Sequence, residues 1–230
     1  MKFDKEEEIF YMKISRNPAF FPILINLQNF PCLVIGGGKV ALRKVLSLLD
    51  FNATVTLLSP RISKQLLNLS KEKKIRIIKK SYSKEFIKEF KIVFCTTDNV
   101  KLNKVVQKDC KEENILINVA DDPLLCGFIL PANVKRGNLT ISVSTQGTAP
   151  FFAKEIRKKI ELLMPPVYKD ITDLASTYRE QMLNNNKFKM PKIKTKMLER
   201  FLEMDWEKIL IEEGKVNSRR YMQKIQNEFN

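Results

Sequence analysis

The first half of the chain alternates short apolar runs with longer segments in which apolar residues recur at helical intervals. The apolar runs lie at residues 31–35, 53–58, 75–78, 92–95 and 115–119. The helical intervals fill the segments between them, at residues 39–49, 62–71, 84–90 and 100–111. Strands that are covered on both faces have continuous rather than alternating apolar sequences. The pattern therefore predicts an α/β fold, with a parallel sheet between two layers of helices.

The pattern changes after residue 122. Residues 128–132 and 139–144 have the composition of strands, and the turn Arg136-Gly137-Asn138 between them predicts an antiparallel pair. From Pro150 onward the spacing is helical. The predicted helices lie at residues 151–164, 167–183 and 196–213, with a polar connector at 184–194. We therefore expect three parts, at residues 1–122, 123–164 and 165–230, of which the middle is a small α+β segment and the last is helical.

A glycine-rich turn joins the first predicted strand to the first predicted helix. Residues 36–41, Gly-Gly-Gly-Lys-Val-Ala, match G-x-G-x-x-A between a strand and a helix, which is the context that gives this motif meaning. The first glycine permits a sharp turn, the third lets the backbone approach a diphosphate, and the helix N-terminus supplies free N–H groups. The motif predicts a Rossmann-type domain that binds a dinucleotide; the alternative is a tight turn without a ligand. The expected cofactor contacts are Gly36, Gly37, Gly38, Lys39 and Val40.

The residue that follows the second strand of such a domain is usually an acid that binds the ribose hydroxyls of NAD. Here Ser59 occupies that position, followed by Pro60 and Arg61. Ser59 can donate one hydrogen bond to a ribose hydroxyl, and Arg61 can accommodate a 2′-phosphate. The sequence therefore leaves the choice between NAD and NADP open, and both residues can instead cap the following helix.

Ligands of open parallel sheets bind beyond the carboxyl ends of the strands. The fourth predicted strand is followed by Thr96, Thr97 and Asp98, which we expect to contact the cofactor, and the fifth ends at residues 118–122. For Asp98 and Asn99 an equal alternative is a role as helix N-cap.

The chain has no histidine, and its four cysteines lie far apart. Without histidine there is no Ser-His-Asp or Cys-His catalytic set, and scattered cysteines argue against a zinc site, so we predict no bound metal. Three of the cysteines have apolar neighbours and are predicted to be reduced core residues. These three are Cys32, Cys95 and Cys126.

Basic residues outnumber acidic ones by 41 to 26, which gives a net charge of +15. Such a balance favours an anionic partner, which could be nucleic acid, an acidic membrane surface or a polyanionic small molecule. A general richness in lysine is the alternative explanation. No apolar run approaches the roughly 18 residues of a membrane-spanning helix, and the first residues lack the pattern of a secretory signal. We expect a cytoplasmic protein that makes no membrane contact.

Several ordered segments carry a resemblance to a known family. They are Phe21–Leu24, Val34–Lys44, Cys95–Asp98, Asn118–Pro123, Phe128–Ala132, Ser144–Pro150 and Ile156–Glu161. Together they resemble the precorrin-2 dehydrogenase and sirohydrochlorin ferrochelatase family, which includes the N-terminal module of siroheme synthases. The resemblance covers roughly residues 20–165. One departure is Gln146, where family members often have a small residue.

The resemblance implies NAD-dependent oxidation of precorrin-2 to sirohydrochlorin in siroheme biosynthesis. In some members it also implies iron insertion, with Fe²⁺ as a substrate, and it implies a homodimer whose middle segments interlock. It places a catalytic aspartate at Asp121, within the matched pattern Asn-Val-x-Asp-x-Pro. A carboxylate at this edge of the sheet can accept a proton while hydride leaves for the nicotinamide. The alternative is that Asp121 caps the turn before Pro123.

The tetrapyrrole substrate implied by the resemblance is a polycarboxylate, which fits the positive charge of the chain. The loop at residues 144–148 precedes a predicted helix and is suited to anions. Lys135 and Arg136 are further candidates, although basic residues at a turn are more often solvated. The expected substrate contacts are Asn118, Ser144, Thr145, Gly147 and Thr148.

The alternative function is a non-catalytic, nucleotide-sensing Rossmann module with a regulatory role, because fold alone does not fix function. A sensor does not need Asp121 and a second ligand loop. No helix-turn-helix with a basic recognition face is evident, so we expect no nucleic-acid partner. The sequence leaves open whether the protein inserts iron and what the C-terminal helices do.

Overall fold

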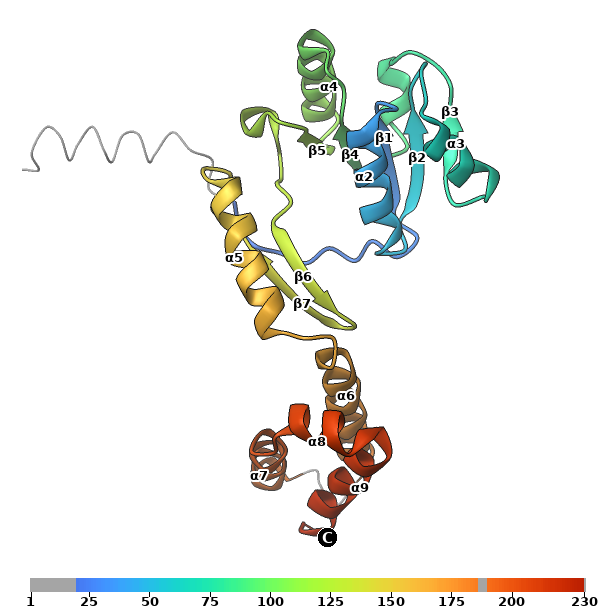
Figure 1. Cartoon of the computed structure of the whole chain (residues 1–230). Helices are drawn as coiled ribbons and strands as arrows, with labels where there is room; N and C mark the ends of the chain where they lie inside the picture. The colour runs from blue at the N-terminus through green and yellow to red at the C-terminus, as the bar shows by residue number, and fades with distance from the viewer. Residues whose placement is uncertain (1–19, 186–189, 230) are drawn as a thin grey trace, which may run out of the picture. The chain divides into compact units, whose positions relative to one another are not determined.

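The computed structural model describes residues 20–185 and 190–229, which form two compact units (Figure 1). The first unit comprises residues 20–130 and 146–148, and the second comprises residues 131–145 and 149–229. The division into three parts expected from the sequence remains a prediction. The N-terminal residues used above to argue against a secretory signal, and residues 186–189 of the expected connector, lie outside the described residues.

The first unit is built on a five-stranded parallel sheet with strand order β3-β2-β1-β4-β5. This confirms the predicted α/β fold, with every strand within a residue of its expected place. The strands are β1 (Pro31–Ile35), β2 (Thr54–Leu58), β3 (Arg76–Ile78), β4 (Ile92–Cys95) and β5 (Leu116–Val119). The connections contain α2 (Lys39–Leu49), α3 (Lys64–Lys71), the short 3₁₀ helix η1 (Lys84–Ile87) and α4 (Val100–Glu112).

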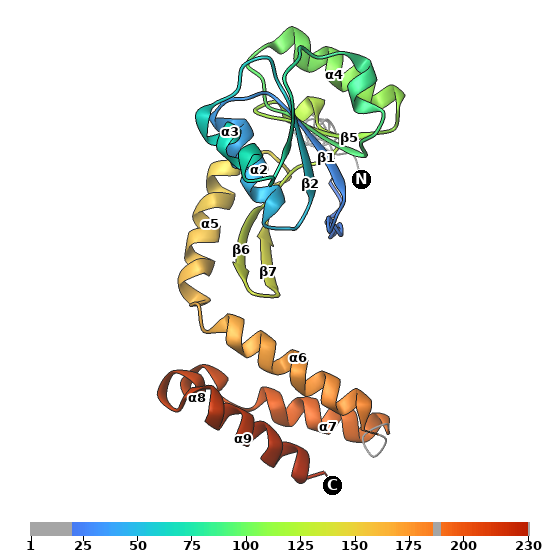
Figure 2. The same cartoon turned by 90° about the vertical axis from the view of Figure 1, so that its right-hand side faces the viewer.

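Two cores form because alternate side chains of each strand point to opposite faces of the sheet. In β1, Cys32 and Val34 are buried with α2 and α3, whereas Leu33 and Ile35 are buried on the other face with α4 and η1. Figure 2 shows α2 and α3 on one side of the sheet and α4 on the other. The chain order reverses between β1 and β4, so this fold forms its ligand crevice at the carboxyl ends of these two strands.

The second unit begins with an antiparallel pair, β6 (Ala132–Arg136) and β7 (Leu139–Val143), followed by α5 (Pro150–Leu163). The strand predicted at residues 128–132 is wrong. Arg136 pairs with Leu139 across a two-residue loop in which Gly137 has a φ of +59°, so the paired residues must flank that loop directly. Phe128 instead packs edge-to-face on Phe94 of the first unit, with ring centroids 5.4 Å apart. Core packing therefore explains why that segment is apolar.

The C-terminal helices have a core of their own. They are α6 (Tyr168–Asn184), α7 (Pro191–Leu202), α8 (Trp206–Glu212) and α9 (Gly214–Asn227). Tyr178, Phe201 and Trp206 stack in sequence inside this core, with centroid distances of 4.8 and 4.6 Å. No helix among residues 20–185 and 190–229 has both the length and the apolar character needed to cross a membrane.

The boundaries of these helices differ from the sequence prediction. The single helix predicted at residues 196–213 is two helices, because Asp205 starts a new one by accepting a hydrogen bond from the Lys208 N–H at 3.0 Å. Pro191 begins α7 inside the expected connector, where its fixed φ suits the first helical position. The last helix, α9, lies in the part that was expected to be helical, but the sequence analysis gave no bounds for it.

Candidate functional site

The glycine turn connects β1 to α2 and packs against the loop that follows β2. The Gly36 N–H donates to the Leu58 carbonyl at 3.0 Å, and Gly36 has a φ of +118°. A side chain at Gly37 would overlap the carbonyl oxygen of Arg61. The Gly37 carbonyl in turn accepts a hydrogen bond from the Ser63 N–H at 2.9 Å. Two of the three glycines are therefore required by the protein itself, before any ligand is considered.

Gly38 is different, because a Cβ added there would meet no atom within 4 Å. It is the N-cap of α2 and makes no side-chain cap. The first N–H groups of an α-helix have no partner within the helix, and here they border the open space beside Gly38. A backbone without a side chain at a helix N-terminus fits the diphosphate of a dinucleotide. Nearby, the buried Ser63 Oγ finds no hydrogen-bond partner within the described part of the chain, which also fits a missing polar ligand.

Ser59 lies at the end of β2 and is only 6% exposed. Its hydroxyl donates to the Arg61 carbonyl at 2.6 Å. Because the hydroxyl proton is already used in this hydrogen bond, Ser59 cannot donate it to a ribose hydroxyl. The Ser59 oxygen can still accept a hydrogen bond from one. The side chain of Arg61 is exposed beside it. The roles of these residues toward a cofactor remain predictions.

The residues that follow β4 pack against the glycine turn. Thr96 Oγ1 donates to the Ile35 carbonyl at 2.8 Å and lies 2.6 Å from where a Gly36 Cβ would stand. The Thr97 hydroxyl donates to the side chain of Asn103 in α4. Asn99 is the N-cap of α4, since its Oδ1 accepts from the Leu102 N–H at 3.1 Å. Of the two roles considered for Asn99, the structure shows that of helix N-cap. The side chain of Asp98 is exposed.

Asp121 lies in a tight turn directly after β5. It is exposed and has a φ of +61°, a left-handed conformation that few non-glycine residues adopt. The turn is held at its start by the Ala120 N–H, which donates to the Cys95 carbonyl at 2.8 Å. Asp121 therefore lies at the carboxyl edge of the sheet, as its position after the fifth strand predicts.

A sulfur atom closes the same turn from the other end. Cys126 Sγ accepts a hydrogen bond from the Val119 N–H at 3.2 Å and lies 3.3 Å from the carbonyls of Val119 and Asp122, either of which its thiol can use. Asn118 Nδ2 also points to this sulfur, at 3.6 Å, and donates to the Phe128 carbonyl at 3.1 Å. Cys126 and the buried Asn118 thus fix the backbone on both sides of Asp121.

Lys44 of α2 is a residue that the sequence analysis quoted but gave no role. Its Nζ lies 5.7 Å from the centroid of the Phe94 ring. Burial lowers the pKa of its ammonium and Arg43 adds to this, whereas Cys126 and Asp121 act in the opposite direction. The ammonium is therefore within electrostatic reach of the Asp121 turn. Its spacing from Ala41, on the buried face of α2, was the available signal.

The loop at residues 146–148 belongs to the first unit and lies against the Asp121 turn. A Cβ on Gly147 would stand 3.7 Å from Cβ of Pro123. The side chain of Gln146 binds the backbone of Phe20 through two hydrogen bonds. Thr148 is exposed. Part of the expected substrate loop is thus brought close to Asp121.

The other expected substrate residues belong to the second unit. Thr145 Oγ1 accepts from the Ala149 N–H at 3.1 Å, and Ser144 is exposed. The guanidinium of Arg136 donates from Nε to the Met164 carbonyl at 2.7 Å, so this side chain binds the end of α5. Lys135 is exposed on β6. The substrate contacts expected from Ser144 and Thr145 remain predictions.

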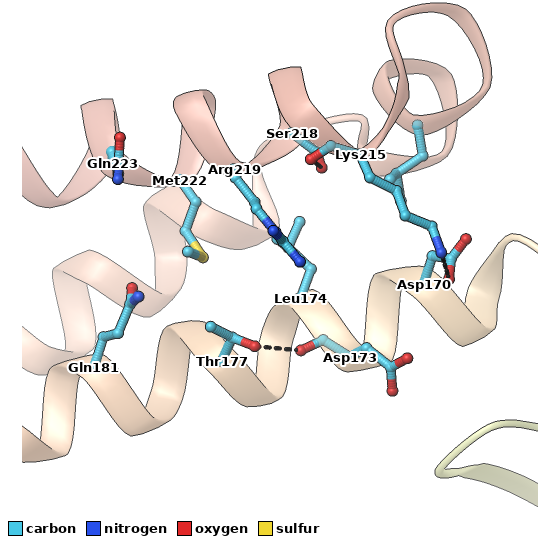
Figure 3. A pocket seen from close by; sticks show the side chains of 11 residues that line it. Asp170, Asp173, Leu174, Thr177, Gln181, Lys215, Ser218, Arg219, Met222 and Gln223 are labelled. Atoms are coloured by element: carbon cyan, nitrogen blue, oxygen red, sulfur yellow. Dashed lines mark hydrogen bonds and ion pairs between the residues drawn. The ribbon is translucent and has the colours of Figure 1, made fainter.

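Two hollows lie away from these residues. One of about 360 Å³ lies between α6 and α9, where Lys215 pairs with Asp170 at 2.7 Å and the Thr177 hydroxyl donates to the Asp173 carbonyl (Figure 3). Its lining carries two carboxylates, Asp170 and Asp173, and two cations, Lys215 and Arg219, so it offers no excess of positive charge to a polyanion. The other, of about 750 Å³, lies at the amino ends of β1 and β2, which is the opposite edge of the sheet from the glycine turn.

Two family models match the chain. The model described as "Putative NAD(P)-binding" matches residues 23–132, and the model described as "Sirohaem biosynthesis protein central" matches residues 136–162. The first model contains the glycine turn and Asp121. The second contains the last residue of β6, all of β7 and most of α5.

Curated relatives share about a third of their length with this chain. The siroheme synthase of Ruthia magnifica subsp. Calyptogena magnifica is 37% identical over 163 residues, which are 71% of this chain and 34% of that protein. The siroheme synthase of Psychrobacter sp. (strain PRwf-1) is 37% identical over 197 residues, 86% of this chain and 38% of that protein. Among solved structures, SirC, precorrin-2 dehydrogenase, matches with a TM-score of 0.74 and 22% identity over 90% of this chain and all of that one, which establishes a shared fold.

Proposed function

We propose, from the premise that the chain belongs to the siroheme synthase family of NAD(P)-binding proteins, that it oxidises precorrin-2 to sirohydrochlorin. The observation that carries the proposal is the position of Asp121, an exposed carboxylate in a rigid turn at the carboxyl edge of a sheet that also carries the glycine turn. A nucleotide sensor has no use for a carboxylate fixed in this way.

The chain's contribution to cofactor binding is a backbone cradle. Gly38 and the start of α2 would hold the diphosphate, while Gly36 and Gly37 keep the turn tight enough for that approach. Lys39, Val40, Ser59 and residues 96–98 would line the rest of the cofactor site. We propose NAD rather than NADP, following the family resemblance. When bound, the nicotinamide supplies the acceptor for a hydride.

Asp121 would act as the base. The oxidation removes two hydrogens from precorrin-2: a hydride that passes to the cofactor and a proton that Asp121 accepts and then releases to solvent. The left-handed turn and the Cys126 contacts hold the backbone that carries the carboxylate in one conformation, which lowers the entropic cost of orientation. Lys44 would keep a positive charge near the turn, where a polycarboxylate substrate has to approach.

The remaining parts of the proposal concern iron and partners. Asn118, Gly147 and Thr148 in the first unit, and Ser144 and Thr145 in the second, would contact the tetrapyrrole. The same Asp121 could accept pyrrole N–H protons if Fe²⁺ enters sirohydrochlorin as a second substrate. A homodimer formed through residues 123–164 and a cytoplasmic location complete the proposal.

The experiment is to mix the purified protein with precorrin-2 and NAD, and to follow NADH and sirohydrochlorin by absorbance. Fe²⁺ is added in a second stage. We expect equal amounts of NADH and sirohydrochlorin in the first stage. Loss of sirohydrochlorin to siroheme in the second would establish iron insertion, and its persistence would limit the protein to dehydrogenation.

The matched variants are Asp121→Ala and Asp122→Ala, which remove neighbouring carboxylates. We expect Asp121→Ala to lose at least about a hundredfold in kcat, as removal of a general base does, while its affinity for NAD is unchanged. Asp122→Ala should keep most of the activity. Full turnover by Asp121→Ala would remove the base from the mechanism.

A further inference from the structure

We propose that Gln146 is a positioning residue that holds residues 20–24 as an apolar wall of the tetrapyrrole site. This inference rests on the proposed function. It concerns the position at which this chain departs from the small residue that the family often has there.

The amide of Gln146 binds the backbone of Phe20 in both directions. The Phe20 N–H donates to Gln146 Oε1 at 2.7 Å, and Gln146 Nε2 donates to the Phe20 carbonyl at 3.2 Å. The two residues are 126 positions apart in the sequence. Both backbone polar groups of Phe20 and both polar atoms of the Gln146 amide thus take part in this contact, which fixes the orientation of the amide.

Gln146 has a side chain at a position where the backbone conformation favours glycine. Gln146 has a φ of +55°, in the left-handed region where glycine is favoured. A glutamine there has a conformational cost that a glycine avoids, yet its side chain makes the long-range contact with Phe20.

The segment that Gln146 holds is anchored at its other end by the core. Leu27 and Phe30 pack against the core that contains α2 and α3. Between the two anchors, the side chains point to solvent: Phe21 is 85% exposed and Leu24 is 90% exposed. Residues 20–24 are therefore a strap, fixed at both ends, that presents large apolar groups.

Gln146 connects the strap to the turn that carries the proposed base. Gly147, next to Gln146, approaches Pro123, two residues after Asp121. Leu124, in the same turn, is 78% exposed. Contiguous apolar patches at a surface can mark ligand-binding grooves as well as interaction sites for proteins or membranes. A tetrapyrrole has broad apolar faces and a rim of carboxylates, so an aromatic ring such as Phe21 could stack on the face while Asp121 reaches the reacting atoms.

The test measures tetrapyrrole binding in the full chain without cofactor, by titrating sirohydrochlorin and following its absorbance. Gln146→Met keeps the length of the side chain and removes both hydrogen bonds. Phe21→Ala removes the ring from the wall. We expect each to raise the dissociation constant about tenfold, and the double variant to raise it little further, because both changes remove the same contact. Gln28→Met makes the same chemical change elsewhere in the first unit and should have no effect.

Two further readouts separate positioning from general loss of structure. Chymotrypsin should cleave Gln146→Met after Phe20 faster than the wild type, while NAD affinity is unchanged. In turnover, KM for precorrin-2 should rise about tenfold with kcat within about twofold.

The outcomes are distinguishable. Wild-type binding by Gln146→Met, or additive effects of about a hundredfold in the double variant, would overturn the inference and leave the proposed function intact. A wild-type protein that binds NAD but no tetrapyrrole would overturn the proposed function, and this inference with it.

Discussion

The sulfur of Cys126 lies 3.2 Å from the backbone nitrogen of Val119, on the opposite side of the turn that carries Asp121. The thiol gives the N–H of Val119, the last residue of β5, a hydrogen-bond partner at the edge of the sheet. It leaves the chain free to turn at Asp121 with a φ of +61°. The geometry of the proposed base thus depends on a side chain five residues away.

Replacing this sulfur should affect catalysis in proportion to the hydrogen bonds that are lost. Cys126→Ser keeps a donor and an acceptor, so we expect kcat within about fivefold of the wild type. Cys126→Val has a similar volume and no polar atom, which leaves the Val119 N–H without its partner at a cost of about 1 to 3 kcal/mol. We expect kcat to fall at least tenfold, with NAD affinity unchanged. Equal kcat in the two variants would show that the sulfur does not position Asp121.

The glycine turn offers a matched pair of substitutions that separates folding from ligand binding. Gly37→Ala would place a methyl group on the Arg61 carbonyl, so we expect the free energy of unfolding in urea to fall by about 1 to 3 kcal/mol. Gly38→Ala meets no protein atom, and its stability should change by less than about 0.5 kcal/mol. Its NAD affinity should nevertheless fall at least tenfold, because the methyl group occupies the space assigned to the diphosphate. Normal NAD binding by Gly38→Ala would place the diphosphate elsewhere.

The sheet was predictable because burial on both faces leaves an unbroken apolar run at each strand, and the glycine turn marks where the first one ends. The pair β6 and β7 shows the limit of this reasoning. An apolar stretch such as 128–132 has the same appearance whether it pairs as a strand or packs on a core. Only the register of the Gly137 turn decides, and it assigns the pairing to residues 132–136.

The site was predictable where topology alone fixes a residue. Asp121 follows the fifth strand, and the carboxyl ends of parallel strands meet at one edge. The supporting residues could not be found in this way. Cys126 had the neighbours of a core cysteine, and the bond between Gln146 and Phe20 joins distant segments through a side chain. Lys44 is the intermediate case, since its place on the buried face of α2 could have been noticed from its spacing.

The loop after β2 should determine the response of the protein to the 2′-phosphate of NADP. Arg61, whose side chain is exposed, lies two residues after Ser59, which occupies the position where an acid would otherwise bind the ribose. We expect Arg61→Glu to weaken NADP binding at least tenfold and NAD binding by less than about threefold, because only NADP has the extra charge. Arg76→Glu, an equal change of charge on β3, is the control. Titration of both nucleotides against the three proteins checks this, and parallel losses for NAD and NADP would contradict it.

The raised pKa values of the buried thiols predict how the free energy of unfolding changes with pH in the alkaline range. Burial raises the pKa of Cys32 and of Cys95 from 9.0 to about 11, and that of Cys110 to about 12. Between pH 9 and these values the unfolded chain loses protons that the folded chain retains. The folded state therefore binds more protons, and the free energy of unfolding falls as pH rises, by up to about 1.4 kcal/mol per pH unit for each thiol.

Cys110→Ala isolates one of these contributions. The cavity left by this substitution lowers the free energy of unfolding at every pH. The stability that the wild type gains from keeping the Cys110 thiol protonated, by contrast, changes only above about pH 9. We expect the wild type to exceed the variant in stability by a margin that is constant from pH 7 to 8.5 and shrinks by about 1.4 kcal/mol at pH 10. Urea unfolding of both proteins, followed by circular dichroism, measures this margin. Ionisable groups that do not interact with Cys110 contribute equally to both proteins and cancel in the difference. A margin that stays constant to pH 10 would mean that the Cys110 thiol ionises as readily in the folded protein as in the unfolded one, which its complete burial opposes.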